Sequence, residues 1–467
     1  MRGLNIPTPV RSSKSLTEAC DAFLEDLKAW IYACIEKYRD EPPTDGHDQL
    51  TYITGWEPYI VASSDEHVAG FLLEIQEQTA AHFIGKDMWQ HGYWRMQEAH
   101  HGTEHFELFL GFMTRVLPHN PTTIAQLVDV AEHIGNWSSD VPEWFDYSTG
   151  LFRSLHFGAD GVRNDESELN MPDHLRCASI LLLAYDVTQD CKYLELADSY
   201  ATLWANAISQ QGNPLPIGIT SSGILYALSG SGEDTYRSFA GMAGALDSDR
   251  DRAENILASG GIQLFLRLWQ ESRNSVFIHA VERLLMVLSS QLPDPDAGPV
   301  ADVIRLYRRV TGKCKFDRLL TQTVGNLSPF KVNVLRMDLP PTLGRRPPGV
   351  GKRADMPVWY EDGCPRRHNP ILLSVAAEIQ NDQALATCAV DLAHAYFSQA
   401  LMLLPDGRDH GCAARTISAI ARGHGRNNHA GMTTAVLLAS IQHFGTPRSK
   451  DAEQAAAHFI GTYRAEK

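Results

Sequence analysis

The 467-residue sequence lacks the features of a membrane or secreted protein. No window approaches the roughly 18 uninterrupted apolar residues that a membrane-spanning helix requires. The first residues have no apolar core of the kind found in secretory signals. None of the eight cysteines forms a Cys-x-x-Cys pair, which predicts reduced, mostly buried thiols rather than a disulfide framework. These absences predict a soluble, cytoplasmic protein.

Positive charge is also in short supply. Lys and Arg number 41 against 56 Asp and Glu, so the formal net charge is −15. Nucleic acids and anionic membranes bind clustered cations, and this balance argues against both as partners. A local basic pocket for an acidic ligand stays compatible with it. The sequence has no Gly-x-Ser-x-Gly elbow and no phosphate-binding loop, which excludes an α/β-hydrolase serine and a P-loop nucleotide site.

Alternating β patterns are almost absent, whereas helical periodicity dominates. Between residues 15 and 38, apolar side chains recur every three or four positions, the spacing of an amphipathic helix. Ser64 and Asp65 then have the character of caps for a second helix. Similar stretches recur to the end of the chain, about fourteen in all by the periodicity. The predicted fold class is all-α.

Three segments repeat one pattern of helix, short polar turn and second helix opened by an aromatic residue or Leu. They cover residues 182–193, 304–316 and 373–385. Hairpins of this kind bury two apolar faces each, and closing them into a ring achieves that. The pattern predicts six or seven hairpins in a single large domain spanning residues 1–467.

The first of these hairpins continues as YDVTQDCKYLELADSYATLWANA and resembles the hairpins of (α/α)6 and (α/α)7 toroid enzymes. Those folds are found in many polysaccharide lyases and in glycoside hydrolases acting on uronyl or unsaturated oligosaccharides. The resemblance extends over most of the chain and concerns architecture more than a catalytic signature. It implies an (α/α)6 or (α/α)7 toroid and a carbohydrate-active enzyme, without identifying a specific family.

Residues 325–370 interrupt the helical pattern with eight prolines and a short basic run. Prolines remove backbone donors and stop helices, so we expect a long irregular segment. It is either an exposed loop or a lid over the mouth of the toroid.

Histidine and tryptophan gather in one part of the chain. Seven of the nineteen histidines lie between His82 and His133. Aromatic rings bind the apolar faces of sugars, so the nearby tryptophans are predicted to bind substrate, unless they form an ordinary core edge. They are Trp89, Trp94, Trp137 and Trp144.

Within this part, His101, Glu104 and His105 match the H-x-x-E-H pattern of inverted zinc proteases. On a helix the two imidazoles would share a face. However, Gly102 and Thr103 resemble a helix start, and no third-ligand motif stands out. We therefore expect no cofactor. A divalent metal on these three residues is the alternative, and histidines bonded to backbone at a helix start are another.

The segment from 135 to 156 holds residue types suited to β-elimination next to a uronate. An Asn, His or Arg neutralises the carboxylate, a Tyr or His removes the C5 proton, and a Tyr protonates the leaving oxygen. Asn136, Tyr147, Arg153 and His156 supply these types. Glu143 and Asp146 instead suit the paired carboxylates of a glycosidase.

A third donor-rich segment lies near the C-terminus. His424, Arg426, Asn427 and Asn428 fall between glycines, in a loop suited to bind a carboxylate or hydroxyls, or else a surface turn. Tyr360 and His368 lie at the end of the proline-rich segment. By contrast, the Asp173–Arg176 stretch is expected to be a helix cap with a local ion pair.

These residues predict a lyase that cleaves acidic, uronate-containing oligo- or polysaccharides. The neutraliser is assigned to Asn136 with His101 or Arg426, the base to Tyr147 or His105, and the acid to Tyr360. One alternative is an inverting glycoside hydrolase using two of Glu98, Glu104, Glu143, Asp146, Glu361 and Asp362. Another is a metal-dependent or non-catalytic toroid.

Overall fold

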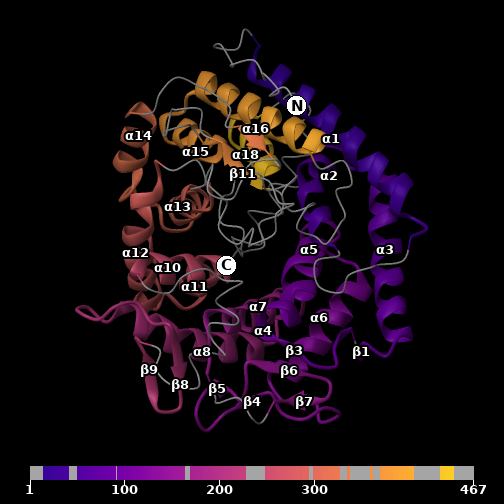
Figure 1. The fold of residues 1–467 in the computed structure, drawn as a ribbon, viewed down its shortest axis with the longest axis vertical. Helices are drawn as coiled ribbons and strands as arrows, with labels where there is room; N and C mark the ends of the chain where they lie inside the picture. The colour runs from indigo at the N-terminus through magenta and orange to yellow at the C-terminus, as the bar shows by residue number, and fades with distance from the viewer. Residues whose placement is uncertain are drawn as a thin grey trace. The chain divides into compact units, whose positions relative to one another are not determined.

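The computed structural model describes residues 14–41, 50–90, 92–163, 169–227, 248–293, 298–326, 334–336, 358–360, 369–403 and 432–445. These residues are mainly helical and include a few small antiparallel sheets, which confirms the all-α class (Figure 1). They divide into two compact units. Unit 1 comprises residues 1–41, 49–74 and 289–467, and unit 2 comprises residues 42–48 and 75–288.

The three predicted hairpins are present. They are α7 (Leu175–Thr188) with α8 (Cys191–Ser209), α13 (Gly298–Thr311) with α14 (Asp317–Asn326), and α15 (Pro370–Gln380) with α16 (Gln383–Leu403). In each, a residue in the left-handed region follows the first helix: Gln189 at φ 59°, Gly312 at φ 70° and Asn381 at φ 52°. This conformation ends a helix and turns the chain back. The repeated pattern in the sequence therefore encodes a repeated turn, in agreement with an (α/α)6 toroid.

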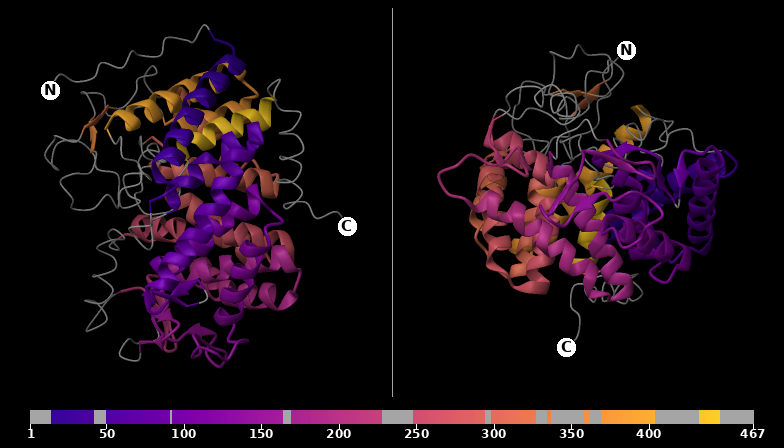
Figure 2. Two further views of the ribbon diagram at one scale, coloured as in Figure 1. Left: turned by 90° about the vertical axis from the view of Figure 1, so that its right-hand side faces the viewer. Right: turned by 90° about the horizontal axis from the view of Figure 1, so that it is seen from below.

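Unit 1 begins with α1 (Leu16–Tyr38), which opens on a capping box. The Ser15 hydroxyl accepts a hydrogen bond from the Glu18 amide at 3.2 Å, and the Glu18 carboxylate accepts one from the Ser15 amide at 2.7 Å. The helix α1 packs against α16 and α18 (Met432–Phe444), and Figure 2 shows these helices side by side. His394 of α16 reaches Asp26 of α1 at 2.7 Å. The short helices η1 (Thr51–Trp56) and α2 (Glu57–Ser63) follow α1 in the sequence.

Unit 2 holds the remaining helices. In chain order they are α4 (Ala99–Glu104), the π-helix η2 (His105–Leu110), α5 (Gly111–Val116), α6 (Pro121–Ile134), η3 (Pro172–His174), α7, α8, α10 (Asp249–Ala258), α11 (Gly261–Ser272) and α12 (Ser275–Leu288). The helix α3 (Glu66–Gly85) contributes residues to both units.

The sheets of unit 2 are short and local. The three-stranded one runs β3 (Gln97–Glu98), β6 (His156–Gly158) and β7 (Gly161–Val162). The others are the two-stranded pairs β1 (Trp89–Gln90) with β2 (Tyr93–Trp94), β4 (Phe145–Asp146) with β5 (Leu151–Phe152), and β8 (Gly218–Thr220) with β9 (Gly223–Leu225). Because β3 leads directly into α4, its pairing with β6 fixes where that helix begins.

Most of the proline-rich segment lies outside the described residues. Besides the helix ends at residues 325–326 and 369–370, its described parts are β10 (Val334–Arg336) and β11 (Val358–Tyr360), which pair antiparallel. Its role as a lid stays a prediction. Within the described ranges, no helix has the length and apolar character needed to cross a bilayer.

The described cysteines are all free thiols. Cys20 is buried, and burial raises the pKa of its thiol to about 12. Burial raises the pKa of Cys177 as well. Cys191 and Cys314 are exposed. The expectation of buried thiols is therefore confirmed for Cys20 and Cys177 and not for Cys191 and Cys314.

Candidate active site

Glu98 connects the small sheet to α4. It ends β3 opposite His156 of β6 and acts as the N-cap residue of α4. Its Oε1 accepts a hydrogen bond from the His101 amide at 2.8 Å and lies 2.6 Å from His101 Nδ1. Burial opposes ionisation of this carboxyl, but the His101 contacts outweigh it and lower the pKa of Glu98. The carboxylate therefore both caps the helix and fixes the orientation of the His101 ring.

His100, the next residue, lies between two other carboxylates. Its Nε2 is 3.2 Å from Glu104 Oε1, one turn along α4, and its Nδ1 is 3.4 Å from Asp173 Oδ1 of η3. Burial and the charge of Arg176 both oppose protonation of the ring. Glu104 and Asp173 outweigh them and raise the pKa of His100 to about 9. His100 is therefore an imidazolium at neutral pH.

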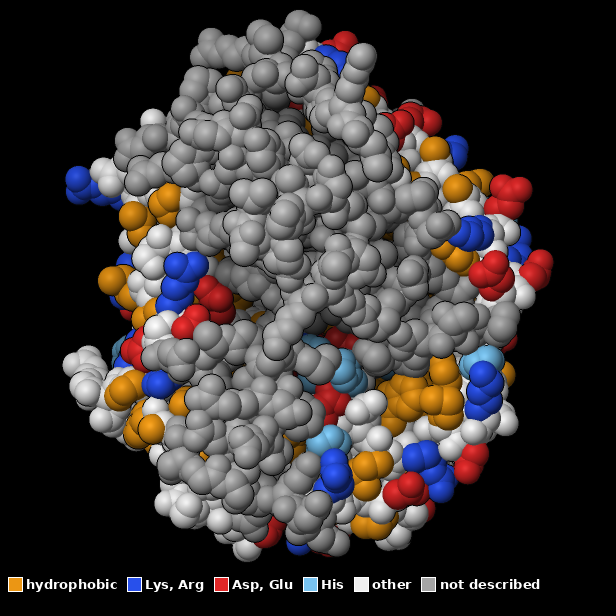
Figure 3. Space-filling model, viewed as in Figure 1, with side chains coloured by type: hydrophobic (Ala, Val, Ile, Leu, Met, Phe, Trp, Pro, Cys, Tyr) orange, Lys and Arg blue, Asp and Glu red, His pale blue; other side chains and the backbone are white. Residues whose placement is uncertain are grey.

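Arg176 and Glu107 form a further ion pair close to His100. The Arg176 guanidinium of α7 is fully buried, and its Nη1 is 2.6 Å from Glu107 Oε2 of η2. Burial raises the pKa of Glu107 more than the nearby Arg176 lowers it. Two cationic groups, the half-buried His100 and the buried Arg176, thus face several carboxyl groups in one cluster. Figure 3 shows imidazole and carboxylate side chains gathered over the region of α4 and α7.

The H-x-x-E-H residues span the junction of two helices. The helix starts at Ala99, earlier than the predicted start at Gly102 and Thr103, and passes into the π-helix η2 at His105. π-turns carry an extra residue and are frequent at functional sites. His105 packs on Trp89, with ring centroids 4.7 Å apart. Burial lowers the pKa of His105 to about 3, so its imidazole is neutral at pH 7.

The contacts of His101, Glu104 and His105 do not support the metal alternative. Among the residues that the structure describes, no group of three or more His, Cys, Asp or Glu side chains is placed to hold one ion. His101 contacts Glu98, Glu104 contacts His100, and His105 packs against aromatic rings. We therefore do not assign these residues as metal ligands, and cofactor dependence stays a prediction.

Asn136 and Tyr147 are bonded to backbone in the loop after α6. Asn136 has φ 54°; its Nδ2 donates to Phe145 O at 2.5 Å and its Oδ1 accepts from the Trp144 and Phe145 amides at 2.9 and 3.2 Å. The Tyr147 hydroxyl donates to Gly135 O at 2.7 Å. Burial raises the pKa of Tyr147. These hydrogen bonds give both side chains a role in holding the loop.

The neighbouring charged residues lie near the surface. Arg153 Nη2 is 2.6 Å from Glu143 Oε2, with both side chains well exposed. Asp146 accepts hydrogen bonds from the Ser148 amide and hydroxyl, which lower its pKa. His156 lies in β6 opposite Glu98, so it is the residue of this segment that the sheet brings next to α4.

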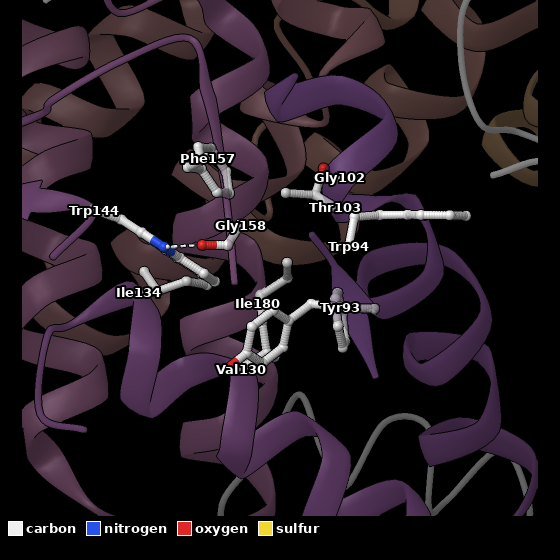
Figure 4. A pocket seen from close by; sticks show the side chains of 11 residues that line it. Tyr93, Trp94, Gly102, Thr103, Val130, Ile134, Trp144, Phe157, Gly158 and Ile180 are labelled. Carbon is white, nitrogen blue, oxygen red and sulfur yellow. Dashed lines mark hydrogen bonds between the residues drawn. The ribbon is translucent and has the colours of Figure 1, made fainter. Parts of the chain in front are cut away.

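The tryptophans divide by burial. Trp89, Trp94 and Trp144 are buried, and only Trp137, at 36% exposed, presents its ring to solvent. Trp144 Nε1 donates to Gly158 O at 2.9 Å beside an apolar cavity of about 10 Å³, which is shown in Figure 4. That volume suits about one water molecule and no sugar ring. The core-edge interpretation therefore describes three of the four.

The remaining predicted residues fall outside the described part of the chain. They are His368, His424, Arg426, Asn427, Asn428, Glu361 and Asp362, together with the side chain of Tyr360. Their assignments stay predictions.

Asp173 and Arg176 make more contacts than the sequence predicts. They do form the expected local ion pair, at 3.6 Å, but they also reach His100 and Glu107, about seventy positions earlier in the chain. His100 was passed over for His101 and His105. The i,i+4 spacing of His100 and Glu104 is the signal that indicates this contact.

Comparisons with known proteins identify no family. No family model and no curated protein sequence matches the chain. Similar solved structures include an unsaturated glucuronyl hydrolase from Streptococcus agalactiae, with a TM-score of 0.45 and 12% identity over 83% of this chain and 94% of that one. An unsaturated glucuronyl hydrolase specific for heparin has a TM-score of 0.44 and 11% identity over 83% and 97%. A D-mannose isomerase has a TM-score of 0.43 and 11% identity over 83% and 99%.

These neighbours are (α/α)6 toroid carbohydrate-active enzymes, the group that the sequence resembles. Because all three TM-scores lie below 0.5, we base the proposals below on the chain's own residues.

Proposed function

We propose that this chain is a carbohydrate-active enzyme that uses acid–base catalysis on uronate-containing oligo- or polysaccharides, with β-elimination as the reaction. The observation that carries the proposal is the pair of adjacent imidazoles. Glu98 holds the Nδ1 side of His101, while His100 is protonated between Glu104 and Asp173. A ring oriented by a carboxylate is suited to act as a general base, and an imidazolium beside it is suited to stabilise negative charge.

In this reaction His101 takes the proton from C5 of the uronate. The electron pair of that C–H bond forms the C4–C5 double bond, the C4–O bond breaks, and the leaving oxygen takes up a proton from an acid. The positive charge of His100 favours the step by stabilising charge that develops at the uronate carboxyl group. These roles replace the earlier assignment of Asn136 and Tyr147, whose polar atoms are bonded to backbone.

Hydrolysis is the second candidate, on one specific observation. Glu104 and Asp173 contact opposite nitrogens of the same imidazole ring. Inverting glycosidases use two carboxyl groups about 6.5–9.5 Å apart, and Glu104 and Asp173 are our candidates for such a pair. One carboxyl group would protonate the glycosidic oxygen and the other would activate water.

One assay separates the two reactions. The purified protein is incubated with a panel of uronate glycans while ultraviolet absorbance and reducing ends are both followed. Elimination raises both signals, because it creates a conjugated unsaturated uronate. Hydrolysis raises reducing ends alone, or lowers the absorbance when the substrate already carries an unsaturated uronate. Silence in both signals across the panel contradicts the proposal.

Two variants assign the base. We expect His101→Gln to lower kcat by about 100-fold or more, the usual contribution of a general base. Tyr147→Phe is the matched control, since it removes only a hydroxyl that is bonded to Gly135 O, and it should retain the rate. The reverse result would return the base to Tyr147.

A further inference from the structure

We propose that Arg176 is a positioning residue that holds the Asp173 carboxylate against His100. The proposal deepens the proposed function, on which its catalytic meaning rests. Its test, however, measures His100 itself and requires no turnover.

The guanidinium contacts three groups from three different elements. Nη1 lies 2.6 Å from Glu107 Oε2 in η2, and Nη2 donates to Ala258 O at 3.3 Å in α10. Nε makes no hydrogen bond; it lies at an ion-pair distance of 3.6 Å from Asp173 Oδ1 in η3. A planar guanidinium presents donors in several fixed directions, whereas a lysine ammonium is a compact point charge on a flexible stem. The arrangement therefore depends on the shape of arginine as well as on its charge.

Asp173 is the group that this arrangement steers. The Oδ1 atom that faces Arg176 is the same atom that lies 3.4 Å from His100 Nδ1. The Asp173 side chain is 23% exposed, so water competes for its carboxylate. By attracting Oδ1 from the buried side, Arg176 keeps it within reach of the imidazole.

The two effects of Arg176 on His100 have opposite signs. Its positive charge disfavours protonation of the ring, whereas the position it imposes on Asp173 favours protonation. A variant that keeps the charge and loses the shape separates the two. The other charged or titratable groups around His100 are Glu98, His101 and Glu104 at α4 and Glu107 in η2.

The experiment is an NMR titration of the full chain with isotope-labelled histidine, in a buffer containing a chelator. The His100 signal is assigned by its loss in His100→Gln. If Arg176 positions Asp173, the pKa of His100 falls by about one unit or more in Arg176→Lys. If Arg176 acts by charge alone, the pKa is unchanged in Arg176→Lys and rises in Arg176→Met. That second pattern would overturn the proposal.

Asp173→Asn provides an independent arm, because this partly exposed residue tolerates substitution better than the buried arginine. We expect a fall in the His100 pKa of similar size. The double variant Arg176→Lys/Asp173→Asn should show little further change, since both substitutions remove one contact. An unchanged pKa in Asp173→Asn overturns the proposal even if the arginine variants fail to fold.

Arg153→Lys is the matched control. Arg153 also pairs with a glutamate at 2.6 Å, but at the surface, so the His100 pKa should stay at its wild-type value. A protein that shows the expected titrations yet cleaves no glycan would refute the proposed function and leave the role of Arg176 intact. Cleavage without these shifts would do the opposite.

Discussion

Gly260 lies where backbone conformation and side-chain space both require glycine. It is the N-cap residue of α11 with φ 75°, a region that L side chains rarely adopt. A Cβ built there would lie 3.0 Å from Glu107 Oε1, and that carboxylate is fixed by Arg176. Glu107 would have to shift by a few tenths of an ångström to accept this Cβ, which would disturb its ion pair with Arg176.

We expect Gly260→Ala to lower the free energy of unfolding by about 2–4 kcal/mol, combining backbone strain with disturbance of the ion pair. Gly212→Ala is the matched control in the same unit, since Gly212 has φ 85° and no atom within 4 Å of the built Cβ. It should lose only about 1–2 kcal/mol. Chemical denaturation measures both. Equal losses would show that the Glu107 contact contributes nothing.

Single side chains were predicted unevenly from sequence. The predicted capping role of Asp65 is confirmed, because a cap is a local pattern: its Oδ1 accepts hydrogen bonds from the His67 and Val68 amides at 3.0 and 3.4 Å. The pairing of Asp173 with His100 spans 73 positions, so no local pattern contains it. The burial of Trp89, Trp94 and Trp144 was equally hidden, because composition alone does not separate a sugar platform from a core edge.

At the scale of an element, Asn136 links the end of α6 to β4. Its left-handed backbone turns the chain, and its amide makes three hydrogen bonds to Trp144 and Phe145. We expect Asn136→Ala to destabilise the protein by about 2–4 kcal/mol, through lost hydrogen bonds and backbone strain. Asn136→Gly, which tolerates the same φ, should cost about 1 kcal/mol less.

Activity per folded molecule distinguishes this structural role from the neutraliser role predicted from sequence. If Asn136 only supports the loop, folded Asn136→Gly retains its kcat on uronate glycans. A loss of kcat at wild-type KM in well-folded Asn136→Gly would instead restore Asn136 to the reaction.

The hairpins were predictable as elements, and the π-helix was not. Each hairpin carries two amphipathic stripes and a turn, a pattern long enough to exceed chance. The π-helix His105–Leu110 adds one residue to a turn, a change that six residues of sequence do not reveal. The i,i+4 spacing of His101 and His105 therefore crosses a helix junction that the sequence does not reveal.

At the scale of the whole molecule, the −15 net charge opposes the approach of an acidic substrate. Because added salt screens this repulsion, we expect kcat/KM for a uronate glycan to rise severalfold between about 10 mM and 150 mM ionic strength. A neutral glycan of the same length, if it is cleaved, is the control and should show no trend. A fall with salt would indicate that a local basic pocket, such as the predicted loop around Arg426, dominates the encounter.

The all-α class was accessible from sequence because period 3.6 persists along the chain. The candidate site was less so, since it forms where α4, η2, η3 and α7 meet. The histidine-rich segment covers α4 and η2, but the buried Arg176 of α7 was expected only as part of a helix cap. Residues whose role depends on tertiary contacts cannot be identified from the local pattern of a single sequence.

The exposed thiols Cys191 and Cys314 are two sites at which spectroscopic labels can be attached. One belongs to unit 2 and the other to unit 1, while Cys20, Cys34 and Cys177 are buried and only weakly ionised. Thiolates, not thiols, react with maleimide and methanethiosulfonate labels, so the exposed pair reacts first among these five. With Cys364, Cys388 and Cys412 replaced by serine, spin labels on the pair would measure whether the distance between them changes when a glycan binds.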